Sequence, residues 1–214
     1  MRIIEPSAEI IIPNATRGID ICKHIEKCGR ICYKSEGKIT DDSYILFIQK
    51  ILERGHEAVL EHFSISIKFV CDRGVSHEIV RHRLASYCQE STRYCNYIKD
   101  DFGGEITVIK PCYLVEGTKG YFDWKESCEK SESAYFDMLE FGCKPQEARA
   151  VLPNSLKTEI MMTANLREWR HFFRLRCSKA AHPQMREVAF KALVAMQEYI
   201  PIIFDDVANK VIPF

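Results

Sequence analysis

The sequence predicts an α+β fold, in which a mixed or antiparallel sheet is flanked by helices and a further part of the chain is helical. Segments with helical periodicity arrive in blocks, which counts against regularly repeated βαβ units. The clearest strand, Phe63–Phe69, has apolar side chains at every second position, the pattern of a sheet with one buried and one polar face. No repeat, low-complexity tract or linker interrupts the 214 residues. The length allows one large domain or two small ones, and we expect a single domain over residues 1–214.

The first part of the chain is predicted to hold one extended segment and two helices. Arg2–Pro13 is β-like because isoleucines dominate it, and Arg17–Cys28 and Asp42–Arg54 have helical patterns. Thr40 or Asp41 would cap the second helix, and the glycine after Arg54 would end it.

The middle of the chain follows the predicted strand. Gly74–Arg83 has the pattern of a short helix, whereas Leu84–Tyr97 lacks a clean period and is predicted to be a loop. Glu105–Lys110 is a candidate short strand. Tyr121–Phe141 is a long amphipathic helix with most of its apolar residues on one side.

The C-terminal part is predicted to be helical. Pro145 is a good first residue for a helical turn. The segment Asn165–Glu168 resembles a capping box and would open a helix that runs to about Arg176. A last helix is expected over Pro183–Tyr199.

The composition limits the class of protein. Lys plus Arg equals Asp plus Glu at 30 each, which counts against a dedicated nucleic-acid binder because such proteins are usually basic. The ten cysteines form no C-x-x-C pair, and the chain starts without an apolar signal region, so free thiols in the cytoplasm are expected. No apolar run approaches the roughly 20 residues that cross a bilayer.

The common nucleotide and metal motifs are missing. The sequence has no G-x-G-x-x-G, no Walker-type G-x-x-x-x-G-K and no zinc-finger spacing, and Leu60 breaks a possible H-E-x-x-H. We therefore expect no metal, and any cofactor must be held in another way.

Arginines are concentrated in two windows that also carry aromatic or hydroxyl residues. The first holds Arg81, Arg83 and Arg93, and the second runs from Arg167 to Arg176. A guanidinium offers a planar fork of donors that suits phosphates, carboxylates and the edge of a base. The windows are typical of a nucleotide site, but composition alone fits a solvated, ion-paired surface equally well.

The order of residues in the first window is specific. Arg81-His-Arg-Leu-Ala-Ser-Tyr-Cys-Gln-Glu-Ser-Thr-Arg-Tyr94 resembles the signature of the flavin-dependent thymidylate synthases. Further segments resemble this family in consistent order over about residues 30 to 190. They are Cys32–Ser35, His56–His62, Glu147–Pro153, Asn165–Arg167, His171 and Leu175–Arg176.

The resemblance implies reductive methylation of dUMP to dTMP by a methyltransferase that is a homotetramer. FAD would be the cofactor, with NADPH and 5,10-methylenetetrahydrofolate as co-substrates. The implied dUMP residues are Glu78, Arg81, Gln89, Glu90, Ser91, Thr92, Arg93, Arg149 and Arg176. The implied FAD residues are Ser35, His56, Ala58, Arg81, His82, Arg83, Leu84, Gln89, Asn165, Arg167 and His171.

The resemblance also implies roles. Arg93 and Arg149 would clamp the phosphate of dUMP, and Arg176 would be the catalytic group that holds the uracil edge and favours ionisation of its imide. His56 would lie against the flavin. Arg83 and its neighbours would hold FAD and shape the folate entrance. No cysteine has an adjacent histidine, and the family works without an enzyme thiolate.

Three positions depart from the family pattern. Cys88-Gln89 replaces a frequent Asn-Glu, so either Glu90 takes over the carboxylate or Gln89 bonds the ligand as an amide. Glu78 stands where Gln is frequent, and His171 aligns with an asparagine that contacts flavin.

Two other functions remain open from the sequence. One is an arginine-lined RNA or nucleotide sensor without turnover, which the balanced charge and the lack of RNA-binding segments disfavour. The other is a sister enzyme on the same scaffold that acts on a different pyrimidine nucleotide or leaves a hydroxymethyl group.

Overall fold

The structure is a computed structural model that describes residues 1–12, 16–98 and 103–211. The chain forms two compact units, each built from three stretches of sequence. Unit 1 comprises Met1–Ser7, Phe69–Arg81 and Cys88–Ile160, and unit 2 comprises Ala8–Lys68, His82–Tyr87 and Met161–Phe214. The single domain expected from the sequence stays a prediction.

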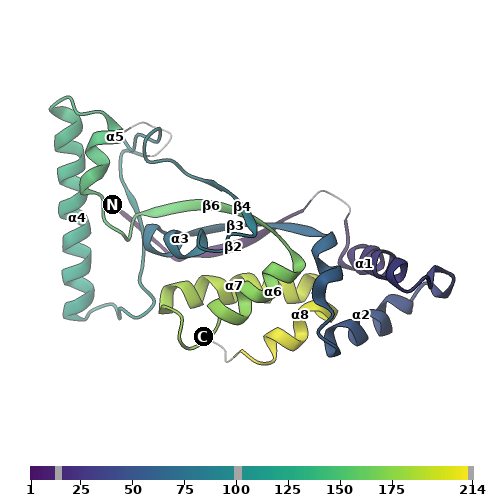
Figure 1. Cartoon of the computed structure of the whole chain (residues 1–214). Helices are drawn as coiled ribbons and strands as arrows, with labels where there is room; N and C mark the ends of the chain where they lie inside the picture. Colours follow the sequence, from purple (N-terminus) through teal and green to yellow (C-terminus); the bar gives the residue numbers. More distant parts are fainter. Residues whose placement is uncertain (13–15, 99–102, 212–214) are drawn as a thin grey trace. The chain divides into compact units, whose positions relative to one another are not determined.

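A four-stranded sheet in the order β2-β3-β6-β4 runs through the fold (Figure 1). The strands are β2 (Ser7–Ile11), β3 (Ser64–Asp72), β6 (Lys157–Asn165) and β4 (Ala85–Gln89). Alternate residues of β3 and β6 are buried, as expected where one face of a sheet lies on the core. The predicted α+β class and the predicted strand at 63–69 are therefore confirmed.

Unit 1 also contains a two-stranded sheet and the long helix. β1 (Arg2–Ile4) pairs in parallel with β5 (Thr107–Ile109). The helices are α3 (Arg73–Ile79), α4 (Lys119–Glu140) and α5 (Pro145–Ala148), followed by the 3-10 turn η4 (Arg149–Val151). Tyr135 of α4 is fully buried and packs edge-on against Tyr97, with ring centroids 5.7 Å apart. The amphipathic helix predicted at 121–141 is thus confirmed.

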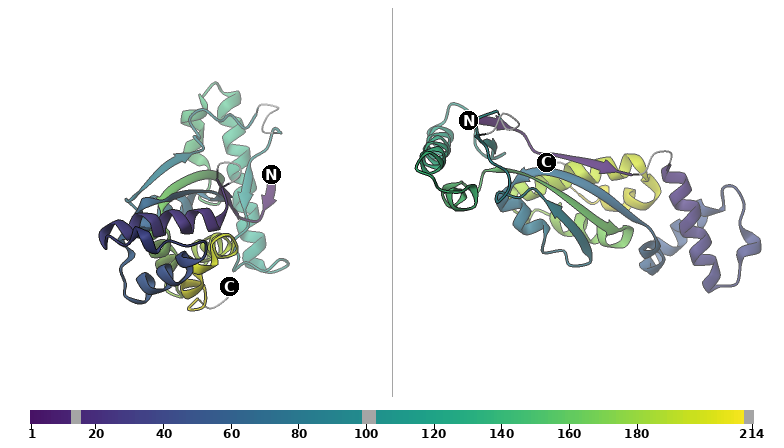
Figure 2. Two further views of the ribbon diagram at one scale, coloured as in Figure 1. Left: turned by 90° about the vertical axis from the view of Figure 1, so that its right-hand side faces the viewer. Right: turned by 90° about the horizontal axis from the view of Figure 1, so that it is seen from above.

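Unit 2 holds the remaining helices around the aromatic core. They are α1 (Gly18–Cys32), η1 (Glu36–Lys38), α2 (Ser43–Glu53), η2 (Glu57–His62), α6 (Leu166–Arg176), α7 (Pro183–Tyr199) and α8 (Pro201–Ala208). Figure 2 shows α1 and α2 side by side. Trp169 is buried in α6, and its indole N–H donates to the Ile65 carbonyl of β3 at 3.0 Å. None of the described helices is both long and apolar enough to cross a membrane.

Several predicted boundaries need correction. The loop predicted over Leu84–Tyr97 is wrong in its first part, because Ala85–Gln89 forms β4. The residue before α2 is Asp42, not Thr40 or Asp41, and its side chain accepts no capping bond. β6 and α8 were not predicted. The helices predicted at 17–28, 165–176 and 183–199 are present, whereas the helix predicted at 74–83 ends at Ile79, so that Arg81 and Arg83 lie beyond it.

A buried arginine joins three elements of unit 2. Arg170 of α6 is 1% exposed and contacts Glu57, Asp206 and the Ile203 carbonyl. Its guanidinium lies 2.6–2.7 Å from the Asp206 carboxylate and 3.1–3.2 Å from Glu57. Burial raises the pKa of Glu57, but hydrogen bonds from Arg174 and Arg170 outweigh this effect and hold the pKa below its usual value.

Asp206 is affected in the same direction. Burial opposes the shift, yet the hydrogen bonds from Arg170 hold the pKa of Asp206 below its ordinary value. Since both carboxyl groups are more acidic in the folded chain, their contribution to stability is present above their unfolded pKa of about 4. It is lost as the pH falls through the folded pKa values.

We predict that Arg170→Met lowers the free energy of unfolding by about 3–5 kcal/mol at neutral pH, because two carboxylates lose a buried cation. The variant should also lose less stability than the wild type between about pH 5 and pH 3. Urea denaturation across this pH range measures both effects. Arg174→Met is the control, since this half-exposed partner of Glu57 should cost about 1 kcal/mol or less. Equal losses for the two variants would contradict the role of Arg170.

Candidate active site

The residues singled out from the sequence divide between the two units. Unit 1 holds Glu78, Arg81, Gln89, Glu90, Ser91, Thr92, Arg93 and Arg149. Unit 2 holds Ser35, His56, Ala58, His82, Arg83, Leu84, Asn165, Arg167, His171 and Arg176.

In unit 1 the segment after β4 brings two arginines to one region. Arg149 lies at the end of α5 and donates from Nη1 to the Thr92 hydroxyl at 3.3 Å. Arg93 donates from Nε to Oε1 of Gln146, which belongs to α5, at 3.1 Å. Both arginines are exposed. The predicted pair is thus anchored to α5, with cationic groups available to an anion.

A cavity of about 370 Å³ lies beside Arg149. Its lining includes Thr92 and Arg149, together with Arg73 and His77 of α3. Cationic and hydroxyl side chains suit an anionic ligand such as a phosphate. Neither Arg73 nor His77 was singled out from the sequence. The one signal for them is their spacing from Arg81, since His77 lies four and Arg73 eight residues before it.

The backbone of the segment 89–95 is held in place by its neighbours. The Glu90 amide donates to the Glu159 carbonyl of β6 at 2.8 Å, and the amides of Tyr94 and Cys95 donate to the Ser91 carbonyl. The Ser91 hydroxyl accepts from the Arg93 amide at 3.3 Å. This turn presents Ser91, Thr92 and Arg93 consecutively. Arg81 is exposed and Glu78 is half-buried at the end of α3.

The side chains of Gln89 and Glu90 point to different partners. Glu90 accepts from Lys157 Nζ at 3.0 Å and from the Glu159 amide at 3.2 Å. Gln89 donates from Nε2 to the hydroxyls of Ser76 and Thr158, at 2.9 and 3.2 Å. The Glu90 carboxylate therefore supports β6, whereas Gln89 belongs to a hydroxyl network.

In unit 2 a chain of three charged or polar side chains joins His82 to the first and last turns of α6. Glu168 Oε1 lies 3.0 Å from His82 Nδ1, and Arg176 Nε donates to His82 Nε2 at 3.0 Å. Asn165 caps α6 by accepting from the Glu168 amide at 2.8 Å, as the sequence predicts. The Glu168 side chain, expected only as part of a capping box, thus holds a histidine 86 residues away in the chain.

The hydrogen bonds of His82 fix its protonation. An arginine Nε–H can only donate, so His82 Nε2 must be unprotonated. The ring proton then lies on Nδ1, where it is donated to Glu168. Burial lowers the pKa of His82, and Arg176 and His171 act in the same direction, while the bond to Glu168 partly opposes them. The imidazole is accordingly neutral and holds Arg176 through a lone pair.

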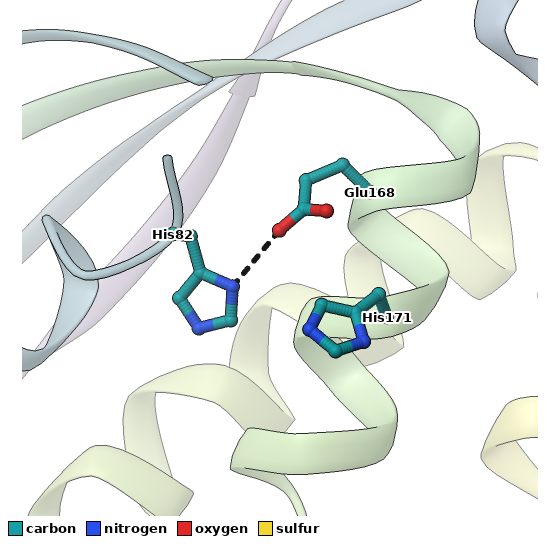
Figure 3. A group of neighbouring side chains, drawn as sticks. All are labelled: His82, Glu168 and His171. Carbon is teal, nitrogen blue, oxygen red and sulfur yellow. Dashed lines mark hydrogen bonds and ion pairs between the residues drawn. The ribbon is translucent and has the colours of Figure 1, made fainter. Parts of the chain in front are cut away.

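Figure 3 shows His82 and Glu168 pointing toward one another, with the His171 ring nearby. The ligand atoms of these three residues lie within 4.8 Å, close enough for a metal ion. The donor set does not suit a cation, however. A metal on His82 Nδ1 would displace the proton to Nε2, where it would meet the Arg176 donor. The arginine cation would also repel the metal. We therefore interpret this cluster as a support for Arg176.

Four of the candidate flavin residues of unit 2, His56, Ala58, Asn165 and Arg167, lie at η2 or at the start of α6. Arg167 pairs with Glu61 of η2 at 2.5 Å and remains half-exposed. His56 directly precedes η2, and Ala58 lies within it; both are exposed. Ser35 is half-buried at the start of η1.

The segment after α3 adds one cationic and one apolar side chain that are both accessible. Arg83 is exposed, and Leu84 is 74% exposed. His171 is also exposed, and its ring lies edge-on to His82 at 5.7 Å. Exposed cations beside an exposed apolar side chain fit a ligand that has both a pyrophosphate and a flat ring system.

Comparisons with known proteins agree with one family. A family model described as "Thymidylate synthase complementing protein" matches residues 19–202. Flavin-dependent thymidylate synthase from Thermococcus kodakarensis is 38% identical over 158 residues, which cover 73% of this chain and 64% of that protein. The same-named protein from Pyrococcus furiosus is 38% identical over 161 residues, 74% of this chain and 65% of the relative. The match therefore spans slightly less than two thirds of these relatives.

Two further matches cover a larger share of the similar protein. Flavin-dependent thymidylate synthase from Geobacter sulfurreducens is 35% identical over 185 residues, covering 83% of this chain and 78% of that protein. A solved structure, the UMP/dUMP methylase PolB from Streptomyces cacaoi bound with 5-Br dUMP, matches with a TM-score of 0.77. It covers 96% of each chain at 21% identity, which shows a shared fold. This chain belongs to the thymidylate synthase complementing protein family.

Proposed function

We propose that this protein is a flavin-dependent thymidylate synthase, a methyltransferase that converts dUMP to dTMP. The carbon donor would be 5,10-methylenetetrahydrofolate, and NADPH would be the reductant through FAD. The observation that carries the proposal is the Glu168–His82–Arg176 chain, because it holds a guanidinium rigidly in a family whose relatives are named for this reaction.

The nucleotide would be anchored by unit 1. Arg93 and Arg149 supply cations for the phosphate, and Ser91 and Thr92 add hydroxyls on the same turn. Glu78, Arg81, Gln89 and Glu90 complete the set proposed for dUMP. Arginine suits this role because its planar fork can form two parallel bonds with a phosphate.

Arg176 would act on the uracil edge. Its Nε is engaged by a neutral imidazole, so the plane of the guanidinium is fixed before the substrate arrives. Negative charge develops on the uracil carbonyl oxygens when the imide ionises or C5 becomes nucleophilic. A preorganised cation stabilises this charge without further reorganisation, which lowers the barrier.

FAD, when bound, carries reducing equivalents from NADPH to the pyrimidine. Arg81, Arg83 and Arg167 would meet its phosphates, while Leu84 and His56 offer contacts for the ring system. Ser35, Ala58, His82, Gln89, Asn165 and His171 complete the proposed flavin set. His82 would serve there as a neutral group, since its two ring nitrogens are engaged by Glu168 and Arg176.

The assembly and location belong to the same proposal. One short chain must surround three large ligands, so we propose a homotetramer with sites at subunit boundaries and with residues 1–214 acting as one domain. Cytoplasmic location would agree with the ten free thiols. Nucleic acid and membrane are not proposed as partners.

A sister activity competes with this proposal, because the structurally similar protein is a methylase of both UMP and dUMP. We predict that the purified protein has a flavin spectrum and converts dUMP to a product in which a methyl group replaces one hydrogen, a mass gain of one CH2 unit. An anaerobic assay with methylenetetrahydrofolate and NADPH, followed by mass analysis of the nucleotide, tests this. UMP serves as the parallel substrate. Preferential methylation of UMP, or a hydroxymethyl product, would favour the sister activity.

We predict that replacing Arg176 or Arg93 by lysine changes different kinetic constants. Arg176→Lys keeps the charge but loses the Nε–H that bonds His82, so the turnover rate at saturating dUMP should fall by about 10- to 1000-fold. Arg93→Lys should mainly raise the dUMP concentration needed, because it removes binding shared by ground and transition states. Stopped-flow flavin oxidation over a range of dUMP concentrations measures both.

The control for these variants is Arg174→Lys, which makes the same substitution on the same helix at a residue paired with Glu57. It should behave as the wild type. Flavin reduction by NADPH without dUMP should survive in Arg176→Lys, since uracil takes no part in that step. Normal turnover of Arg176→Lys at saturation would remove Arg176 from its proposed role.

A further inference from the structure

Gln89 belongs to a hydrogen-bond network of four buried or half-buried side chains in unit 1. Gln89 Nε2 donates to Ser76 Oγ at 2.9 Å and to Thr158 Oγ1 at 3.2 Å. Ser76 is fully buried and Thr158 is 1% exposed. Arg73 Nη1 also donates to Thr158 Oγ1, over a longer 3.4 Å, and to the Glu90 carbonyl at 3.3 Å.

The protons of this network determine which way the Gln89 amide faces. Ser76 Oγ donates its single proton to the Arg73 carbonyl at 2.9 Å. It can therefore only accept from Gln89. Thr158 Oγ1 already accepts from Arg73, and this favours a second donor over an oxygen at the same site. The Ser76 hydroxyl requires the nitrogen of Gln89, and Thr158 also accepts from this nitrogen. The amide oxygen Oε1 is therefore directed away from the Ser76 hydroxyl.

Glu90 does not compete for this position. Its Oε2 is engaged by Lys157 and by the Glu159 amide, and its side chain is half-buried along β6. Of the two candidates for the family carboxylate, Glu90 is thus bonded to β6, whereas the bonds of Gln89 to Ser76 and Thr158 use its Nε2.

We propose that Ser76 and Thr158 are positioning residues, which hold the Gln89 amide so that Oε1 accepts a hydrogen bond from the bound nucleotide. The inference rests on the proposed binding of dUMP to unit 1. At neutral pH the base and sugar of dUMP carry two donors, the N3–H of uracil and the 3′-hydroxyl. An acceptor held in one orientation selects for such a donor, whereas a freely rotating amide would present either group.

The test is a double-mutant cycle on dUMP affinity, measured by equilibrium dialysis of the purified full-length protein. Ser76→Ala combined with Thr158→Val removes both acceptors of Gln89 Nε2 while nearly preserving volume. We predict about three- to tenfold weaker dUMP binding, the scale of one hydrogen bond. In a Gln89→Ala background the same pair of changes should alter the affinity by less than about twofold, because the effect acts through Gln89.

Two controls separate positioning from a general loss of packing. Thr163→Val makes the same substitution on β6, at a hydroxyl bonded to Ser66 at 2.7 Å, and should leave dUMP affinity unchanged. Thr158→Ser keeps the acceptor and should also retain affinity, which preserves the test if the double variant fails to fold. With 2′,3′-dideoxyuridine monophosphate as the probe, the Gln89→Ala effect should vanish if the 3′-hydroxyl is the donor and persist if N3–H is.

The outcomes distinguish this inference from the proposed function. A wild-type protein that does not bind dUMP overturns both. A wild type that binds dUMP, with variants that retain wild-type affinity or whose effects add fully to that of Gln89→Ala, overturns the positioning role alone.

Discussion

The candidate site depends on one neutral histidine between a carboxylate and a guanidinium. His82 is almost fully buried and packs against Phe172, with ring centroids 4.8 Å apart. The Tyr87 hydroxyl donates to the His82 carbonyl at 2.5 Å, so the backbone of His82 is held as well as its ring. Because each ring nitrogen has a specific partner, the orientation of Arg176 follows from the position of α6. The flexible Arg176 side chain is therefore held in place by α6, a helix that is capped at Asn165 and packs its aromatic residues into the core.

The arginines of α6 illustrate how one helix divides similar residues among different tasks. Arg170 is buried and links Glu57 with Asp206, while Arg174 reinforces Glu57 from the exposed side. Arg167 pairs with Glu61 near the helix start. From composition, an ion-paired surface and a nucleotide site were equally compatible with this window. Arg167, Arg170 and Arg174 are ion-paired, as the surface interpretation expects, and Arg176 donates to His82. The nucleotide site stays a proposal for this window.

Sequence patterns identified what is encoded locally and missed what depends on distant partners. The alternation over 63–69 and the asparagine cap at 165 are local, and both are confirmed. β4 was missed because Ala85–Gln89 carries little apolar contrast, and its pairing with β6 depends on residues about 70 positions away. Glu168 was foreseen as a helix cap only, since nothing near it in the sequence indicates His82. The order of Arg81–Tyr94 resembled the family closely, but the hydroxyls that orient Gln89 lie on α3 and β6.

The most direct test of the account is the protonation of His82, because a neutral ring with its proton on Nδ1 is what holds Arg176. Nitrogen-15 NMR of histidine-labelled protein over about pH 6 to 8 reports the state of each ring nitrogen. The account predicts a protonated Nδ1 and an unprotonated Nε2 at neutral pH, with conversion to imidazolium only at a lower pH than for an unperturbed histidine. It also predicts that Glu168→Gln changes the Nδ1 signal. A positively charged ring at neutral pH, or a proton on Nε2, would show that Arg176 does not donate to His82 and would contradict the account.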